Sequence, residues 1–87
     1  MPKSIKIAPS LDEIRYEDGK IVTEFGKLRI TFKLKVELEG EEDIKAVKAW
    51  LQQAIAMSSK THQLEFFMSQ CKTTDGQEVG EIEVEEI

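Results

Sequence analysis

The chain has 87 residues, of which 12 are Lys or Arg and 17 are Asp or Glu, so its formal net charge is −5. This length predicts a single domain over residues 1–87, and the acidic balance weighs against nucleic acid and anionic membranes, which bind mainly Lys and Arg. A single cysteine, Cys71, and the lack of any apolar run of transmembrane length predict a cytoplasmic protein in a reducing compartment.

Two short elements open the chain. Ile5 and Ile7 predict an edge strand that ends at the proline two residues later, because proline lacks the N–H that a central strand needs. Residues 13–25 then predict a hairpin. Its turn is Asp18-Gly19, since both residue types tolerate the positive φ of a tight turn.

The strongest pattern is an unbroken alternation of apolar and polar residues over 28–38. A period of two predicts a long strand with one face on the core and the other in water. Arg29, Lys33 and Lys35 fall on the outer face. We expect this strand to lie at or near the middle of the sheet.

A helix is predicted from Glu41 to about Ser58 or Ser59. Gly40 ends the preceding strand, and Glu41 is followed by two further acidic residues that complement the positive end of the helix dipole. Ile44, Val47, Leu51 and Ile55 have the spacing of one buried face.

The rest of the chain predicts a second hairpin. Residues 62–72 alternate, which places Leu64, Phe66 and Met68 on one face of a strand. Residues 73–77 contain a second Asp-Gly turn, and residues 78–87 read as the last strand.

Together these elements predict an α+β fold. We expect a mostly antiparallel sheet of five to six strands with one amphipathic helix packed on one face, in the order β-β-β-β-α-β-β. The predicted core is Leu28, Ile30, Phe32, Leu34, Val36, Ile44, Val47, Leu51, Ile55, Leu64, Phe66, Met68, Ile82 and Val84.

Nothing in the sequence specifies catalysis, a cofactor or a metal. The single histidine, His62, and Cys71 would lie about 30 Å apart along one strand, so they predict no nucleophile–base pair. The acidic residues before and within the predicted helix start match no calcium loop and are explained by the helix dipole. We therefore expect no catalytic, cofactor-binding or metal-binding residues.

The charges of two strands are complementary. The outer face of the long strand is basic, and Glu81, Glu83 and Glu85 share one face of the last strand. Opposite charges on neighbouring strands stabilise a sheet modestly. We therefore predict that these two strands are neighbours, which favours neutralisation within the sheet over a nucleic-acid site.

The feature that most favours a function is a surplus of apolar surface. On the predicted helix, Trp50, Met57 and Ala46 extend beyond the core stripe, and Phe67 points away from the core face of its strand. One interpretation is that Trp50 and Met57 cover the edge of the domain's own sheet and that the N-terminal segment packs over Phe67. The other is that they contact another chain, since Trp and Met are enriched at interfaces.

Three functional hypotheses follow. The first is a non-enzymatic protein-interaction or assembly module that self-associates or binds a heterologous protein, of the kind found among small phage accessory proteins. The second is an acidic inhibitor that mimics nucleic acid and acts on a basic protein. The third is a small ligand-binding domain or enzyme with its pocket between helix and sheet.

Overall fold

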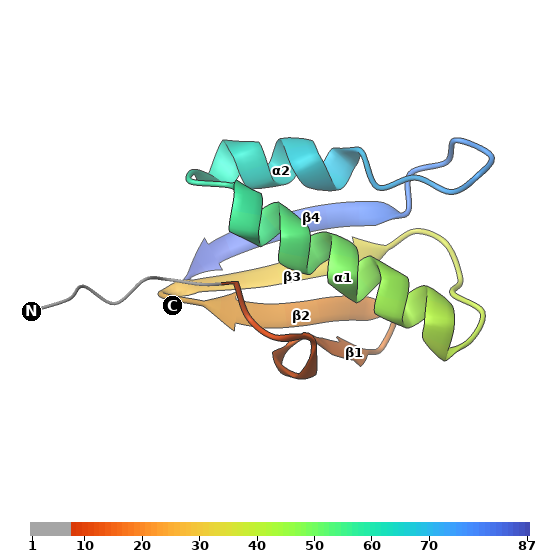
Figure 1. Ribbon diagram of the computed structural model, residues 1–87, viewed down its shortest axis with the longest axis horizontal. Coiled ribbons are helices and arrows are strands. Elements are labelled where there is room, and N and C mark those ends of the chain that lie inside the picture. Colours follow the sequence, from red (N-terminus) through yellow and green to blue (C-terminus); the bar gives the residue numbers. More distant parts are fainter. Residues whose placement is uncertain (1–7) are drawn as a thin grey trace, which may run out of the picture.

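The computed structural model describes residues 8–87, which form a sheet with two helices on one of its faces (Figure 1). The α+β class is confirmed, but residues 8–87 have the order β-β-β-α-α-β, with four strands and two helices, where the sequence predicted five to six strands and one helix for the chain. The strands are β1 (Arg15–Glu17), β2 (Lys20–Phe25), β3 (Leu28–Leu34) and β4 (Gly80–Glu86), and the helices are α1 (Glu41–Met57) and α2 (Thr61–Ser69), with a short 3₁₀ turn, η1 (Leu11–Glu13), before β1.

The sheet is antiparallel throughout, and its spatial order is β1-β2-β3-β4. β3 is therefore a central strand, as its long alternation predicted. Ile21, Phe32 and Ile82 lie side by side on the face that the helices cover. The predicted edge strand at Ile5 and Ile7 falls outside the described residues.

The first predicted hairpin is confirmed. β1 and β2 pair around Asp18 and Gly19, whose φ angles are 50° and 74°. Both angles lie in the left-handed region that Asp and Gly tolerate better than other residues. A second tight turn at Gly26, with φ 62°, joins β2 to β3.

β3 ends at Leu34, four residues before the predicted end at Leu38. The reason is that both neighbouring strands stop there: the Leu34 N–H donates to the carbonyl of Gly19, and Lys35 makes one further bond, to Val79. The alternation nevertheless retains its effect. Beyond the strand, Val36 and Leu38 are half-buried and pack against the core.

α1 has the bounds that the sequence predicted, to within one or two residues. Its first turn holds the three acidic residues, and its buried face is Val47, Leu51, Ala54 and Ile55. This spacing of three and four residues is the stripe that a helix presents to a sheet.

The strand predicted over residues 62–72 is wrong, because this segment forms α2. Leu64 and Met68 are buried, four residues apart on one helical face. Phe66 was expected in the core with them, but it points to solvent and is 61% exposed. The alternation was accidental, and a period of 3.6 accounts for the burial of this segment.

The second predicted hairpin is correct in its turn and wrong in its first arm. Thr73 and Gln77 are joined by a backbone hydrogen bond of 2.9 Å, and Gly76 has φ 86°. Before the turn, however, only an isolated bridge between Lys72 and Glu78 forms, instead of a strand.

β4 begins at Gly80, where a side chain would be excluded. A Cβ at this position would collide with the backbone carbonyl of Lys33 and lie 3.1 Å from the Phe32 ring. The close approach of β4 to β3 at this point therefore requires glycine.

The core lies between the sheet and the two helices. Ile30, Phe32, Leu51 and Met68 are fully buried, as predicted. Other predicted core residues, such as Val84, pack against the core while remaining half-buried, whereas Ile44 is half-buried and does not join the core cluster. The prediction omitted Ile14, Ile21, Thr23, Ala54, Cys71 and Val79, all of which are buried.

Candidate interaction surface

The side of α1 that lies next to its buried stripe and faces α2 carries large apolar side chains. Trp50 is 44% exposed and Met57 is 63% exposed. Ala46 lies on the same side of the helix and is also exposed. Because α1 already buries a full stripe against the sheet, these residues are surplus to the core.

An open groove of about 600 Å³ runs between α1 and α2. We call it the helix groove. Its lining residues are Ala46, Ala49, Trp50, Gln53, Ala54, Met57, Phe67 and Gln70. The structure thus brings together in one place all four residues that the sequence singled out, namely Ala46, Trp50, Met57 and Phe67.

Sequence reasoning missed the other half of the helix groove. It placed Phe67 on a strand, so it could not predict that Gln70 lies one helical turn further along the same wall. A pattern that could have been found is the spacing of Leu64, Phe67, Met68 and Cys71, which fits one face of a helix.

A side-chain hydrogen bond ties the two walls of the groove together. The indole Nε1 of Trp50 donates to the backbone carbonyl of Phe67 over 3.1 Å. The ring of Phe67 meets that of Phe66 edge-on, with centroids 5.9 Å apart. Trp50 is therefore a structural tie between the helices that still presents nearly half of its surface to solvent.

A second hollow of about 520 Å³ lies between α1 and the segment after α2. Trp50 and Ala46 line both hollows, so Trp50 stands between them. Cys71 lies at the base of this second hollow and is buried, and its burial raises the pKa of the thiol. A protonated, enclosed thiol is a poor nucleophile.

His62 and Cys71 stand at opposite ends of α2. Their separation is shorter than a strand would give, about 14 Å for nine helical residues, and still beyond hydrogen-bond reach. Within residues 8–87, no three His, Cys, Asp or Glu side chains are placed so that they could hold a metal ion.

The uncovered face of the sheet carries the charge pairs that the sequence predicted. β3 and β4 are neighbours, and Arg29 lies directly opposite Glu85, with its guanidinium 3.7 Å from that carboxylate. Lys33 reaches Glu83 at 3.1 Å. The basic face of β3 is therefore largely matched by β4, which weighs against a site for nucleic acid.

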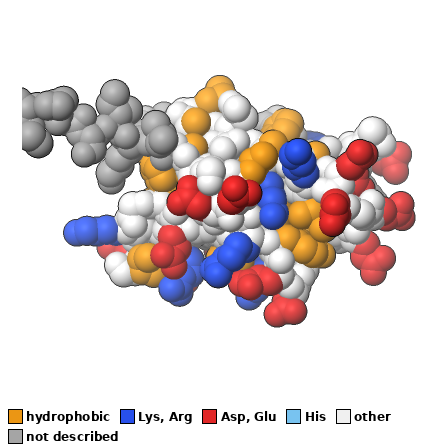
Figure 2. Space-filling model, turned by 60° about the horizontal axis from the view of Figure 1, so that its bottom comes forward, with side chains coloured by type: hydrophobic (Ala, Val, Ile, Leu, Met, Phe, Trp, Pro, Cys, Tyr) orange, Lys and Arg blue, Asp and Glu red, His pale blue; other side chains and the backbone are white. Residues whose placement is uncertain are grey.

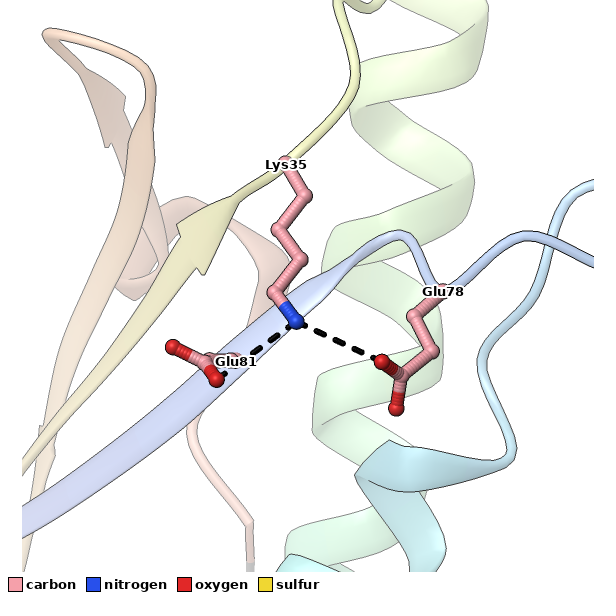
Figure 3. Close-up of polar contacts among 3 residues, drawn as sticks. All are labelled: Lys35, Glu78 and Glu81. Carbon is pink, nitrogen blue, oxygen red and sulfur yellow. Dashed lines mark hydrogen bonds and ion pairs between the residues drawn. The ribbon is translucent and has the colours of Figure 1, made fainter.

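Just beyond β3, Lys35 forms ion pairs with two carboxylates at once (Figure 3). Lys35 Nζ lies 3.3 Å from a carboxylate oxygen of Glu78 and 3.5 Å from one of Glu81. The hydrogen bond to Glu78 is the main reason why the pKa of Lys35 is raised. This three-residue cluster lies at the point where the pairing of β3 and β4 ends.

The remaining charge is unevenly distributed. Seen from the side of β1, acidic and basic side chains alternate along most of the molecule, and acidic ones gather at one end (Figure 2). The acidic first turn of α1, with Glu41, Glu42 and Asp43, lies at this end.

Comparisons with protein-family models, with curated proteins and with solved structures each found no match for this chain. Neither α1 nor α2 is long and apolar enough to cross a membrane.

Proposed function

We propose that this domain is a non-enzymatic protein-interaction module that self-associates through the helix groove and the exposed face of α1. The observation that carries the proposal is the absence of charged side chains from the lining of the helix groove. One third of all residues are charged, yet none of the eight residues lining the helix groove is. Depletion of charge around exposed aromatic and Met side chains is typical of the centre of a protein interface.

The free energy gained by burying exposed apolar side chains favours the same function. Trp50 and Met57 leave 44% and 63% of their surface in water. Removing apolar surface from water contributes about 25 cal/mol per Å². A partner that covers this face therefore gains free energy without having to desolvate a charge in the groove.

The two alternative functions have less support. Mimicry of nucleic acid needs unmatched carboxylates, whereas Glu83 and Glu85 of β4 are paired with cations of β3. A small-molecule site or an enzyme usually has a few convergent polar or titratable groups in an enclosed cavity. The helix groove is open, and its polar lining side chains are those of Trp50, Gln53 and Gln70.

The test is the solution mass across a concentration series, measured by light scattering, with Trp50 fluorescence read on the same samples. We expect an oligomer at high concentration whose blue-shifted emission moves to the red as dilution separates the copies. A monomer at every concentration, with constant emission, would contradict the proposal.

Two variants test whether the contact between copies lies in the helix groove. Met57→Glu adds a negative charge within the helix groove and should yield a monomer. Lys27→Gln changes the net charge by the same amount on the exposed turn between β2 and β3, and it should associate like the wild type. Equal loss of association in both variants would indicate a general charge effect instead of a groove contact.

A further inference from the structure

We infer that the occupant of the helix groove is a second copy of this chain, docked so that the two α1 helices run antiparallel about a twofold axis that passes between Trp50 and Gln53. This inference rests on the proposed function and adds to it the geometry of the pair. In a twofold interface every contact occurs twice, so the surface must be complementary to itself.

The two ends of α1 differ in charge. Its first turn carries three acidic residues, and its last turn carries no basic one. At the far end the next charged residue is Lys60, which precedes α2, and the first turn of α2 contains no acidic residue. One end of the helix layer is thus acidic, and the other combines a cation with the positive end of a helix dipole.

This asymmetry selects the direction of pairing. An antiparallel pair places the acidic first turn of each α1 beside Lys60 of the second copy and the start of its α2. A parallel pair would place Glu42 and Asp43 beside the same carboxylates of the second copy. Like charges in contact are destabilising, so the antiparallel arrangement is favoured.

The groove residues of α1 are spaced so that an antiparallel pair is complementary to itself. A register that brings Ala46 opposite Met57 of the second copy also pairs Trp50 with Gln53, and it leaves the acidic first turn of α1 at the end of the second copy where Lys60 lies. In each direction the exposed thioether of Met57 then meets the small side chain of Ala46. A large side chain facing a small one is the complementarity that close helix packing requires.

The size of the helix layer sets the strength of the pair. At 1.5 Å per residue, α1 is about 26 Å long and α2 about 13 Å. With helices about 10 Å across, the helix layer offers roughly 400 Å² per copy in projection, near 800 Å² for the pair. This is below the range of permanent complexes, so the pair should dissociate on dilution.

Disulfide cross-linking tests the geometry. Two single-cysteine variants, Ala46→Cys and Met57→Cys, are made with Cys71→Ala, and one carries a tag that distinguishes its mass. In the antiparallel pair, positions 46 and 57 of different copies are adjacent, whereas two copies of position 46 lie about 16 Å apart. A disulfide requires Cα atoms within about 7 Å.

We therefore expect the mixed sample in a glutathione redox buffer to form the mixed disulfide at least tenfold in excess over either self-linked product. If Cys71→Ala does not fold, the same experiment is run with Cys71 retained, since that thiol is buried, and the parent chain gives the background.

The outcomes separate the two proposals. A dimer by light scattering in which Ala46→Cys links to itself is parallel, and a dimer that forms none of these links uses another surface. Either result overturns the antiparallel pair and leaves self-association standing. A monomer by light scattering overturns both proposals.

A charge exchange provides a second measurement that needs no cysteine. Glu42→Lys and Lys60→Glu each replace an attractive contact with a repulsive one at both ends of the pair, so each should raise the dimer Kd by about 2- to 30-fold. The double variant restores the attraction and should bring Kd back toward that of the wild type. Additive losses in the double variant would overturn the antiparallel register.

Discussion

The Trp50 indole and the Phe67 carbonyl connect the two helices through a hydrogen bond of 3.1 Å. The same carbonyl accepts a second hydrogen bond, from the backbone N–H of Gln70. Carbonyls in the last turn of a helix lack the usual N–H donor four residues further on, and Trp50 of α1 supplies a second donor to this one. The exposed tryptophan thus has a structural role that its exposure alone would not indicate.

Trp50→Phe should destabilise the domain by about 0.5–1 kcal/mol. The substitution keeps an aromatic ring but removes the N–H donor, and an exposed hydrogen bond contributes at the lower end of the usual range. Urea unfolding, followed by far-UV circular dichroism, measures the loss. Phe66→Leu, on an exposed aromatic in the neighbouring helix, is the control and should change stability less. Equal stability of Trp50→Phe and wild type would show that the hydrogen bond does not hold α2.

Met68→Ala and Phe66→Ala test the register of α2. Met68 is 1% exposed, so its truncation should cost about 2–5 kcal/mol, whereas the loss of the Phe66 ring should cost about 0.5 kcal/mol or less. Urea midpoints of the two variants give the comparison. A strand would have buried both side chains on one face, so losses of similar size would support a strand and contradict the helix.

Two periodicities coexist in the segment that forms α2, and the sequence alone does not decide between them. Leu64, Phe66 and Met68 satisfy a period of two, while Leu64, Phe67, Met68 and Cys71 satisfy a period near 3.6. Over about ten residues both patterns fit, and only packing decides between them. Packing against α1 and β4 buries Leu64 and Met68 together, which selects the helix.

Arg29→Glu tests the charge pairs between strands. Arg29 lies between Glu24 on β2 and Glu85 on β4, within 3.6 and 3.7 Å of their carboxylates. Reversing its charge puts three acidic side chains in one row and should cost about 1 kcal/mol at low salt, because these pairs are exposed.

The salt dependence of this loss is the decisive measurement. It should shrink in 1 M NaCl, where the screening length falls to about 3 Å. Lys45→Glu, which makes the same change in net charge on the exposed surface of α1, is the control. A loss that is the same at both salt concentrations would mean that packing of the arginine stem, and not its charge, stabilises the sheet.

Glu13 should make stability depend on pH in the acid range. Its carboxylate accepts hydrogen bonds from the backbone N–H and the hydroxyl of Ser10, and these lower its pKa from the ordinary value of 4.5. Because the folded-state pKa lies below the unfolded one, the carboxylate stabilises the fold above the unfolded value. That contribution is lost as the pH falls through the folded value.

The comparison of wild type with Glu13→Gln measures this contribution. The difference in urea midpoint should be constant above about pH 5 and should close as the pH falls below 4.5. Ser10→Ala removes one of the two donors and should reduce the difference only in part. A difference that persists unchanged to pH 2.5 would exclude a role for the carboxylate charge.

The parts of the fold that were predicted correctly depend on long or redundant patterns. α1 has acidic residues at its start and a buried stripe from Val47 to Ile55, and both signals agree. The pairing of β3 with β4 followed from complementary charge over several positions, of which Arg29 and Glu85 are one pair. The helix groove could be predicted only on its α1 wall, because Phe67 comes to face Trp50 only through the fold of α2.

The position of β4 has a consequence for the order of folding. β1, β2 and β3 are joined by tight turns, whereas residues 35–79 must fold back before β4 can pair with β3. Contacts between distant parts of a chain form slowly, because closing the intervening loop costs entropy. Gly26→Ala, in the turn between β2 and β3, should therefore slow refolding in stopped-flow experiments, and Val84→Ala, in β4, should mainly accelerate unfolding. The three-stranded meander would then be the folding nucleus, and β4 would be the element whose detachment limits how long the native state persists.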